Sequence, residues 1–427
     1  MFRLVTDLWQ RAEEALRDGG AHIAGSPAAV AAAAHEVAPG VLFCEAFANV
    51  AAFATPDGLL LVDSGTIVTA EWLHEAVRAW SPAEVRCIVL THGHVDHVMG
   101  LGPFDREAEA AGRRPPEVVA HEAVLERFEI YRRTAGYNGL INHRQFGIPP
   151  DWPVEYRLPD RTYRDRMELT LGGETFELRH SRGETDDQTW VWARDRNIVC
   201  CGDLFISLAP NAGNPQKRQR FALEWARALR EIIGVDPDLV LPGHGLPLRG
   251  RETIVRVLGE TAEWLEALHD QVVALMNAGA PLDEIVRRVR PPEGLRDRPY
   301  LRGLYDEPEF VVRNIWRRYG GWWDGNPARL KPPPDAELAA EMAAMAGGVD
   351  ALAARAEALL GEDRPAIAAQ LIEWAVQADP SSDRAHAVRF AVYRRLSELG
   401  PSLMASGIYR WAARTSRKRD KPADTPG

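Results

Sequence analysis

Four potential metal ligands fall within six residues of the segment THGHVDH, which spans residues 91–97: His92, His94, Asp96 and His97. In an extended segment, side chains two apart point to the same side, so His92 and His94 can bind one ion. Once the chain turns, Asp96 and His97 can face a second ion. Imidazole and carboxylate ligands suit zinc, iron or manganese. Two such ions about 4 Å apart share a water and supply a hydroxide nucleophile at neutral pH.

Three further candidate ligands each follow a predicted strand: Glu184 in the motif GET, Asp203 in CGD, and His244 in PGHG. Each is a weak signal alone, because strand-end turns commonly carry polar residues. Their order after the histidine motif favours one metal site over a surface cluster of histidines. Asp63 also ends a predicted strand, and we interpret it as a residue that orients the histidines, with an ordinary turn as the alternative. We assign His180 a packing or supporting role.

The segments around these residues predict alternating strands and helices. Runs of apolar residues bounded by turns predict strands over residues 41–43, 51–54, 59–62, 87–90, 169–171, 175–180, 189–193, 198–201 and 239–241. Apolar residues with helical spacing predict helices over residues 69–80 and 224–233. Each candidate ligand then lies just beyond a strand. Because hairpins are interspersed with strand–helix units, the pattern favours a layered αββα domain over a pure doubly wound sheet.

From about residue 251 the sequence predicts mainly helices. Apolar residues recur with a period near 3.6 over residues 255–277. Four more helices are predicted at 335–345, 349–360, 365–377 and 382–398. They look like a short stack of helical hairpins, although two pairs are too few to define a repeat. Between these regions, residues 291–334 are predicted to be rich in loops and are unusually aromatic. We interpret these aromatics as the core of a dimer, with an alkyl channel as the alternative.

The composition excludes several classes of protein. The 427 residues are 46% hydrophobic, which is enough for a full-sized core, and the net charge of −10 argues against a general nucleic-acid binder. No long uncharged apolar stretch predicts a signal peptide or a membrane span. The four cysteines show no C-x-x-C spacing, so we interpret them as core residues in a reducing cytoplasm rather than redox or metal thiols.

The candidate ligands resemble those of the metallo-β-lactamase superfamily, whose signature is H-x-H-x-D-H followed by three later ligands. Most members carry histidine in a Gly-His-Thr motif, where this sequence has Glu184. A glutamate there is a feature of the alkylsulfatase branch, which hydrolyses alkyl sulfates. The motifs at 270–271, 275–277, 299–302 and 321–327 are similar to the alkylsulfatase dimerisation domain. The resemblance covers roughly residues 40–412.

The resemblance implies an α/β fold, an αββα metallo-β-lactamase sandwich followed by an all-α C-terminal domain. We expect four parts: an N-terminal helical segment (1–40), the catalytic domain (41–250), a helical dimerisation domain (251–412) and a disordered tail (413–427). We also expect a homodimer formed by the region from about residue 255 to residue 330, because its aromatics exceed what a lone helical layer could bury. No counterpart of the sterol-carrier-like domain of the long alkylsulfatases follows residue 412, so we expect shorter alkyl chains to be preferred.

Carried over by motif, the resemblance implies two metal ions, with zinc expected. One ion would be bound by His92, His94 and Glu184, and the other by Asp96, His97 and His244. Asp203 would bridge the two ions, and both Asp96 and Asp203 would orient the nucleophile as catalytic residues. The family usually has a glutamate as the bridging residue, so the aspartate is a departure with a shorter reach.

A sulfate ester needs cationic or amide donors near the metals. Two segments carry candidates, namely Asn142 and Arg144 after the metal loop, and Asn211, Lys217 and Arg218 after Asp203. The family places an arginine near the latter segment, and either Lys217 or Arg218 is its nearest equivalent. Solvated loop residues are the alternative for all of these side chains.

The sequence therefore predicts a metal-dependent hydrolase of alkyl sulfate esters that uses a metal-bound hydroxide. Attack at sulfur and attack at carbon both remain open. One alternative is a hydrolase of a lactone, a thioester or a β-lactam on the same metals. A second alternative is a non-catalytic metal-binding scaffold, which a site with two open-faced ions argues against.

Overall fold

The computed structural model describes residues 5–19, 32–400 and 402–417. The chain forms two compact units, which are described separately. The first comprises Met1–Asn138 and Asp151–Gly321, and the second comprises Gly139–Pro150 and Trp322–Gly427. Among the described residues, no helix combines the length and the apolar character that crossing a membrane requires.

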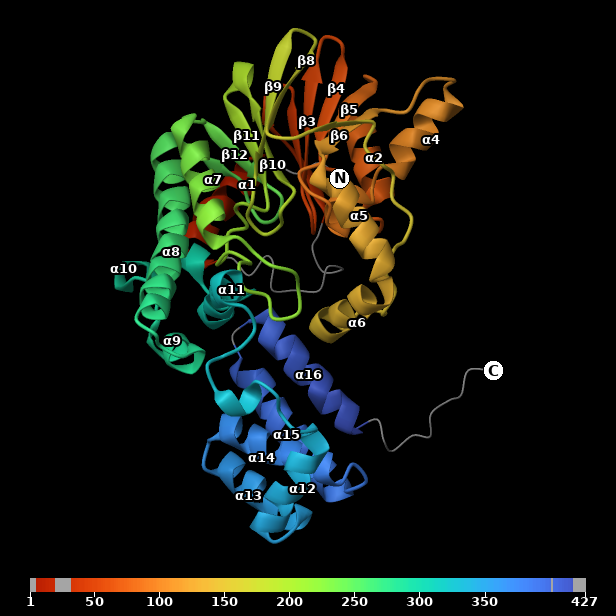
Figure 1. The fold of residues 1–427 in the computed structure, drawn as a ribbon. Helices are drawn as coiled ribbons and strands as arrows, with labels where there is room; N and C mark the ends of the chain where they lie inside the picture. Colours follow the sequence, from red (N-terminus) through yellow and green to blue (C-terminus); the bar gives the residue numbers. More distant parts are fainter. Residues whose placement is uncertain (1–4, 20–31, 401, 418–427) are drawn as a thin grey trace. The chain divides into compact units, whose positions relative to one another are not determined.

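Two β-sheets form the centre of the first unit (Figure 1). The first sheet contains β1 (Ala33–Ala38), β2 (Val41–Glu45), β3 (Val50–Thr55), β4 (Gly58–Val62), β5 (Val85–Val89), β6 (Glu117–His121) and β7 (Arg161–Tyr163), in that order. The second contains β13 (Leu248–Arg249), β12 (Leu239–Pro242), β11 (Ile198–Gly202), β10 (Gln188–Ala193), β9 (Glu174–Ser181) and β8 (Arg166–Leu171). Strands β4 to β7 are parallel, as are β11 and β12, whereas the other neighbours are antiparallel.

Helices lie on the outer faces of both sheets of the first unit (Figure 1). The helices of this unit are α1 (Val5–Glu14), α2 (Ala70–Trp80), α3 (Val95–Val98), α4 (Gly102–Ala110), α5 (Ala123–Arg133), α7 (Ala222–Gly234), α8 (Arg251–Asn277), α9 (Leu282–Arg288), α10 (Glu293–Arg296) and α11 (Pro308–Gly320). Helix α6 (Ala135–Phe146) contributes residues to both units. Helices α2, α4 and α5 pack on the first sheet, and α7 and α8 on the second.

Three apolar layers hold these elements together. Phe53 of β3 and Phe176 of β9 meet between the sheets, with ring centroids 5.3 Å apart. In β4, Leu60 faces this inner layer, whereas Leu59 and Leu61 face the helices, so both faces of the strand are buried. This explains why the strand is a continuous apolar run in the sequence. The αββα sandwich predicted from the sequence is confirmed.

Three segments differ from their sequence predictions. Strand β1 lies inside residues 1–40, because its Ala-rich segment pairs with β2, and this pairing overrides the helical preference of alanine. Helix α11 occupies part of the stretch predicted to be loop-rich: Pro308 begins it, and Val311 and Ile315 are buried one turn apart. Residues 413–417 belong to the last helix rather than to a tail, and the rest of that predicted tail lies outside the described residues.

The division between the units also differs from the boundary placed at residues 250 and 251. Helix α8 packs along α7, and both belong with α11 to one apolar core. The long amphipathic face of α8 is buried there, with Leu258 and Leu265 fully inaccessible to solvent. The first unit therefore extends to Gly321.

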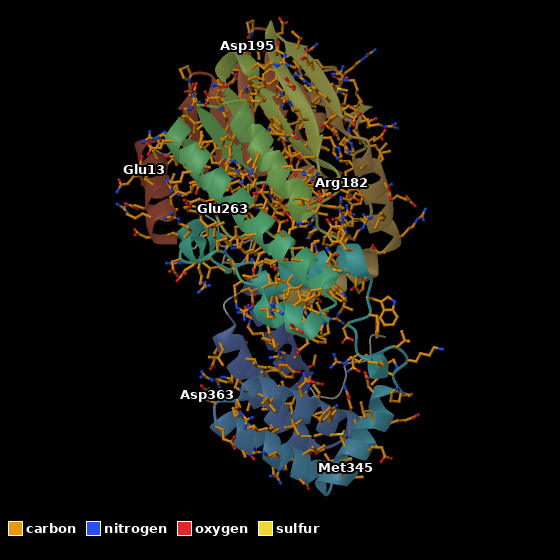
Figure 2. All side chains as sticks on the ribbon, turned by 60° about the vertical axis from the view of Figure 1, so that its left-hand side comes forward. Glu13, Arg182, Asp195, Glu263, Met345 and Asp363 are labelled. Atoms are coloured by element: carbon orange, nitrogen blue, oxygen red, sulfur yellow. The ribbon has the colours of Figure 1, made fainter. Side chains whose placement is uncertain are left out.

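The second unit is a bundle of helices built around an apolar core of its own. Apart from α6 it contains α12 (Asp335–Ala346), α13 (Val349–Gly361), α14 (Pro365–Ala378), α15 (Asp383–Leu399) and α16 (Leu403–Arg417). Small residues such as Ala353 and Ala368 let the helices approach closely around Ile372. Met345 is 82% exposed and projects outward from α12 (Figure 2).

Candidate metal centre

Asp63 fixes the loop that carries the histidine motif. The residue directly follows β4, with a positive φ of 67°, beside the end of the parallel strand β5. Its carboxylate accepts hydrogen bonds from the backbone N (2.7 Å) and Oγ1 (2.8 Å) of Thr91. The same carboxylate lies 2.8 Å from Nδ1 of His97, which turns Nε2 of that ring toward the site. The structure therefore gives Asp63 the orienting geometry expected from the sequence.

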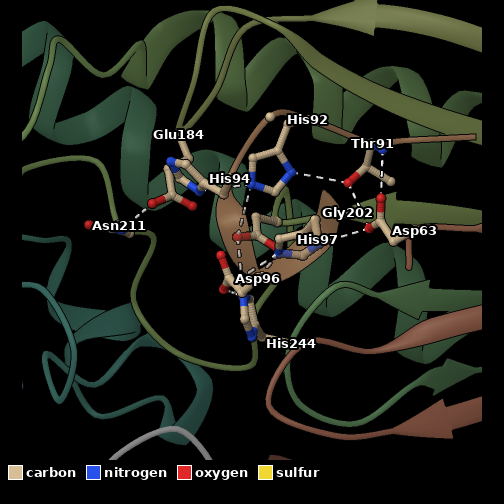
Figure 3. A network of polar contacts seen from close by, with 12 residues as sticks. Asp63, Thr91, His92, His94, Asp96, His97, Glu184, Gly202, Asn211 and His244 are labelled. Atoms are coloured by element: carbon tan, nitrogen blue, oxygen red, sulfur yellow. Dashed lines mark hydrogen bonds and ion pairs between the residues drawn. The ribbon is translucent and has the colours of Figure 1, made fainter. Parts of the chain in front are cut away.

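One group of candidate ligands contains His92, His94, Glu184 and Asp203, whose ligand atoms all lie within 4.8 Å of one another. Nε2 of His92 and Nδ1 of His94 are 2.8 Å apart, and Nε2 of His92 is 3.6 Å from Oδ2 of Asp203. His92 is fully buried, and its other ring nitrogen lies 3.0 Å from Oγ1 of Thr91. His92 and His94 follow β5, Glu184 follows β9 and Asp203 follows β11. Figure 3 shows His92, His94 and Glu184 close together.

The second group contains Asp96, His97 and His244, again with ligand atoms within 4.8 Å of one another. Asp96 and His97 lie on the short helix α3, so the turn predicted after His94 is a helical one. Nε2 of His244 lies 3.3 Å from Nε2 of His97 and 3.4 Å from Oδ2 of Asp96. Nδ1 of His244 contacts the carbonyl oxygen of Phe47, which fixes the orientation of the ring.

Asp203 reaches both groups. Its Oδ1 is 3.3 Å from Nε2 of His97, and its Oδ2 is 3.4 Å from Nε2 of His244. The carboxylate is 2% exposed, and Oδ1 has no hydrogen-bond partner. The shorter reach of aspartate is therefore sufficient for a carboxylate shared between the groups. The structure brings together all seven side chains that the sequence motifs suggested as ligands.

Burial and mutual charge interactions shift the pKa values of the clustered ligand candidates. Burial raises the pKa of Glu184 to about 8, and the nearby carboxylate of Asp203 adds to the shift. Burial lowers the pKa of His92 to about 4, with His97 acting in the same direction. Buried carboxylates and ring nitrogens thus converge on one place, where their mutual repulsion and desolvation are unfavourable unless positive charge is present.

The structure places Lys217 and Arg218, two candidate residues for binding the sulfate, in different surroundings. Lys217 is half-buried, and its Nζ lies 5.7 Å from the centre of the Trp152 ring. Burial lowers its pKa to about 8, whereas the charges of Glu184 and Asp96 act in the opposite direction, so its ammonium lies within electrostatic reach of both ligand groups. Arg218 instead approaches Asp186, at 3.6 Å, with its side chain 45% exposed. Lys217 is therefore the better-placed cation.

The remaining substrate-side candidates lie in different places. Asn211 is buried and donates a hydrogen bond from Nδ2 to Oε1 of Glu184, next to the ligands. Asn142 and Arg144 belong to the second unit, where the guanidinium of Arg144 lies 4.7 Å from the centre of the Trp411 ring. Their role in binding substrate stays a prediction.

His180 lies outside both ligand groups. Its ring stacks on that of His121 with centroids 3.7 Å apart, and its Nε2 lies 2.9 Å from the carbonyl oxygen of Asp186. This arrangement agrees with the packing role expected for His180.

Three residues beside the site lie outside the motifs identified in the sequence: Arg220, Asp187 and Arg127. Arg220 is 3% exposed and forms an ion pair with Glu184 at 3.1 Å. Asp187 is fully buried, accepts a hydrogen bond from the backbone N of Gly93 and pairs with Arg127 at 2.8 Å. The acidic pair directly after the GET motif was the signal that could have identified Asp187. Arg220 has no such motif.

Tyr305 is a fourth neighbour of the site. Burial raises the pKa of its phenol well above the usual value, and the charges of Glu184 and Asp96 add to the shift. The hydroxyl therefore lies within electrostatic reach of both ligand groups. Tyr305 belongs to the aromatic stretch of residues 291–334, which the sequence predicts to form a dimer core.

An αββα sandwich with two histidine–carboxylate groups at the strand ends of its sheets defines a class of metal-binding hydrolase folds. The chain matches the family model of the metallo-beta-lactamase superfamily over residues 45–244 and that of alkyl sulfatase dimerisation over residues 281–419. The chain is thus similar to the metallo-beta-lactamase superfamily and, within it, to the alkylsulfatases.

The curated relatives agree with this assignment. A linear primary-alkylsulfatase of Pseudomonas sp. is 28% identical over 366 residues, which cover 80% of this chain and 69% of the relative. An alkyl/aryl-sulfatase of Saccharomyces cerevisiae is 24% identical (82% and 57% covered), and an (R)-specific secondary-alkylsulfatase of Pseudomonas sp. is 25% identical (89% and 61% covered). The chain thus spans between 57% and 69% of the length of these three relatives.

A solved structure shares the fold. The stereoselective inverting sec-alkylsulfatase from Pseudomonas sp. superposes with a TM-score of 0.80 at 22% identity, and the match covers 92% of this chain and 66% of that one. The similarity therefore includes the helical C-terminal part as well as the sandwich.

Similarity to the metallo-beta-lactamase superfamily implies binding of divalent metal, and the residues present fit such an ion. Both ligand groups combine imidazole nitrogens with carboxylate oxygens, the ligand types that divalent transition metals favour. The buried Oδ1 of Asp203, which lacks a hydrogen-bond partner, fits the same requirement. The contacts of His97 with Asp63 and of His244 with Phe47 leave the Nε2 atoms of both rings facing the site.

Proposed function

We propose that this protein is a metal-dependent hydrolase of alkyl sulfate esters. The observation that carries the proposal is the meeting of the two ligand groups at Asp203, with Glu184 where most members of the superfamily have histidine. The alkylsulfatases among the relatives support the choice of sulfate esters.

We assign the metal site as two zinc ions. His92, His94 and Glu184 would bind one ion, Asp96, His97 and His244 the other, and Asp203 would be shared. When bound, such ions supply a hydroxide nucleophile at neutral pH and stabilise negative charge on the ester. The seven candidate ligands are too many for one tetrahedral ion.

The chain's own residues position the sulfate ester. Lys217 would hold a sulfate oxygen, because its ammonium is half-buried and interacts electrostatically with Glu184 and Asp96, and a charge interaction is stronger there than in water. Tyr305 would donate its phenolic proton in a hydrogen bond to the ester, since the phenol stays protonated at neutral pH. Asp96 and Asp203 would orient the nucleophile, since both carboxylates lie 3.4 Å from Nε2 of His244.

We also propose that the protein is a homodimer and that its C-terminal half forms the interface. The family model of alkyl sulfatase dimerisation spans residues 281–419. Trp322 and Trp323, which are 72% and 40% exposed, are the kind of large apolar side chains that an interface buries. Light scattering at micromolar concentration tests this proposal, and a monomer would contradict it. A cytoplasmic location remains a prediction from the cysteines.

A substrate panel tests the proposed activity. Hexyl, octyl and dodecyl sulfate, nitrophenyl sulfate, a lactone, a thioester and nitrocefin are compared after elemental analysis of protein purified without chelator. We expect two metal ions per chain and turnover of the alkyl sulfates. Turnover of the lactone or thioester without any sulfate ester would overturn the proposal. Hydrolysis in ¹⁸O-labelled water separates attack at sulfur, which labels sulfate, from attack at carbon, which labels the alcohol.

A further inference from the structure

Arg220 is a buried cation that the proposed chemistry does not use. It lies just before α7, and its side chain is 3% exposed. Buried guanidinium groups are rare unless they are paired, because desolvation of the charge is costly. Its partner is Glu184, the residue that distinguishes this site from most of the superfamily.

We infer that Arg220 is the positioning residue that fits Glu184 to its metal ion, by holding one carboxylate oxygen and by balancing the charge that glutamate brings in place of histidine. This inference rests on the assignment of Glu184 as a ligand under the proposed function.

The contacts of Glu184 leave one of its oxygens for an ion. Oε1 of Glu184 accepts a hydrogen bond from Nδ2 of Asn211 and lies 3.1 Å from Nη2 of Arg220. The other terminal nitrogen of Arg220, Nη1, donates to the backbone carbonyl of Glu184 itself. The guanidinium thus grips the side chain and the main chain of one residue, so the direction of the carboxylate is set. Oε2 receives neither donor and is the oxygen that can turn to the ligands His92 and His94.

Arg220 is itself held in place by α11. Its backbone N lies 3.4 Å from Oδ1 of Asn314, and its carbonyl oxygen accepts a hydrogen bond of 3.0 Å from Nδ2 of the same residue. Asn314 is 3% exposed, so neither bond competes with bulk water. A guanidinium anchored at its own backbone loses little entropy when it binds the carboxylate, which favours a preorganised site.

The ion pair of Arg220 and Glu184 also balances charge at the metal site. A histidine ligand is neutral, whereas Glu184 adds a negative charge among the carboxylates of Asp96 and Asp203. Arg220 adds a positive charge back, within ion-pair distance of the same carboxylate. If this is its role, Arg220 is needed only while residue 184 is acidic, and in a histidine variant it becomes an unpaired buried charge.

A double-mutant cycle on the full chain tests this coupling. Arg220→Met, Glu184→His and the double variant are titrated with Zn²⁺ against a chromophoric chelator, and with Co²⁺ to follow ligand-field spectra. We expect Arg220→Met to lower the affinity for one of the two ions by about 10- to 100-fold, the range for residues that orient metal ligands. The double variant should regain that ion. Arg318→Met, which removes an exposed arginine paired with Glu224, is the matched control and should change neither affinity.

Two outcomes overturn the inference. One is an unchanged affinity for both metal ions in Arg220→Met. The other is a double variant whose loss of metal affinity equals the product of the losses in the two single variants. If Arg220→Met does not fold, the double variant decides, because a cation that only supports the fold is required with either ligand. Arg220→Lys, which keeps the charge, should retain both ions. Glu184→Ala separates the two proposals: if it keeps both ions, the assigned metal site is wrong, whereas loss of an ion there but not in Arg220→Met contradicts only the role of Arg220.

Discussion

The two ligand groups of the metal centre are built in different ways. In the group of Asp96, His97 and His244, the histidines are oriented by acceptors, the carboxylate of Asp63 and the carbonyl of Phe47. In the group that contains Glu184, the acidic ligand is oriented by donors, Asn211 and Arg220.

The difference follows from the chemistry of the ligands. An imidazole presents a lone pair to a metal when its other nitrogen donates a proton, so it needs an acceptor behind it. A carboxylate needs a donor on its second oxygen, and a buried carboxylate needs positive charge as well. A glutamate ligand in place of a histidine therefore requires different neighbouring residues, namely donors and positive charge instead of an acceptor.

The largest effect is expected where the two groups meet. Asp203→Ala removes the shared carboxylate, so both ions should bind weakly, and activity should fall by more than about 1,000-fold. Metal content and sulfate-ester turnover measure the two effects. His180→Ala is the control, because the ring of His180 stacks on His121 outside both groups, and it should retain both ions. Loss of an ion from His180→Ala but not from Glu184→Ala would contradict the ligand assignment.

The next effect concerns Lys217, whose pKa responds to the charges of Glu184 and Asp96. Lys217→Met should lower kcat/KM for alkyl sulfates by about 100-fold, as expected when one charge-stabilising donor is lost, and leave the metal content unchanged. Arg218→Met should have a much smaller effect, because Arg218 approaches the exposed side of Asp186. A larger loss from Arg218→Met than from Lys217→Met would assign the sulfate to the other residue.

A smaller effect sharpens the contrast between the groups. Asp63→Asn leaves the hydroxyl of Thr91 with a partner but weakens the acceptor behind His97. We expect affinity for the ion of that group to fall by about 10-fold, the lower end of the range for such partners, with the other ion unaffected. Titration with Co²⁺ resolves the two sites, and equal weakening of both would show that the groups are not independent.

The sequence was more informative about ligands than about what supports them. The order of the motifs suggested all seven candidate ligands, because each follows a strand and strand ends gather at one edge. It also placed Asp63 behind the histidines. Arg220 could not be found in this way, since its role depends on a contact with a residue 36 positions away in the chain. Similarly, α11 escaped prediction because its apolar residues are interrupted by charged ones that face solvent.

The smallest effect is a change in the pH dependence of stability, at the loop that carries Asn211. Asp306 holds this loop by accepting hydrogen bonds from the backbone N atoms of Gly213, Asn214 (3.2 Å) and Glu307 (2.8 Å). Burial raises its pKa from 3.8 to about 7, although these hydrogen bonds oppose the shift. Between these values the folded protein keeps a proton that the unfolded chain releases, so the contribution of Asp306 to stability falls as pH rises from about 4 to about 7.

Asp306→Asn has no such proton. Its melting temperature should therefore rise relative to that of the wild-type protein between pH 5 and pH 8, with both proteins metal-free. The exposed Asp335→Asn should show no such trend. A constant difference between Asp306→Asn and the wild type at both pH values would mean that Asp306 is ionised throughout, and that the hydrogen bonds from the loop outweigh its burial.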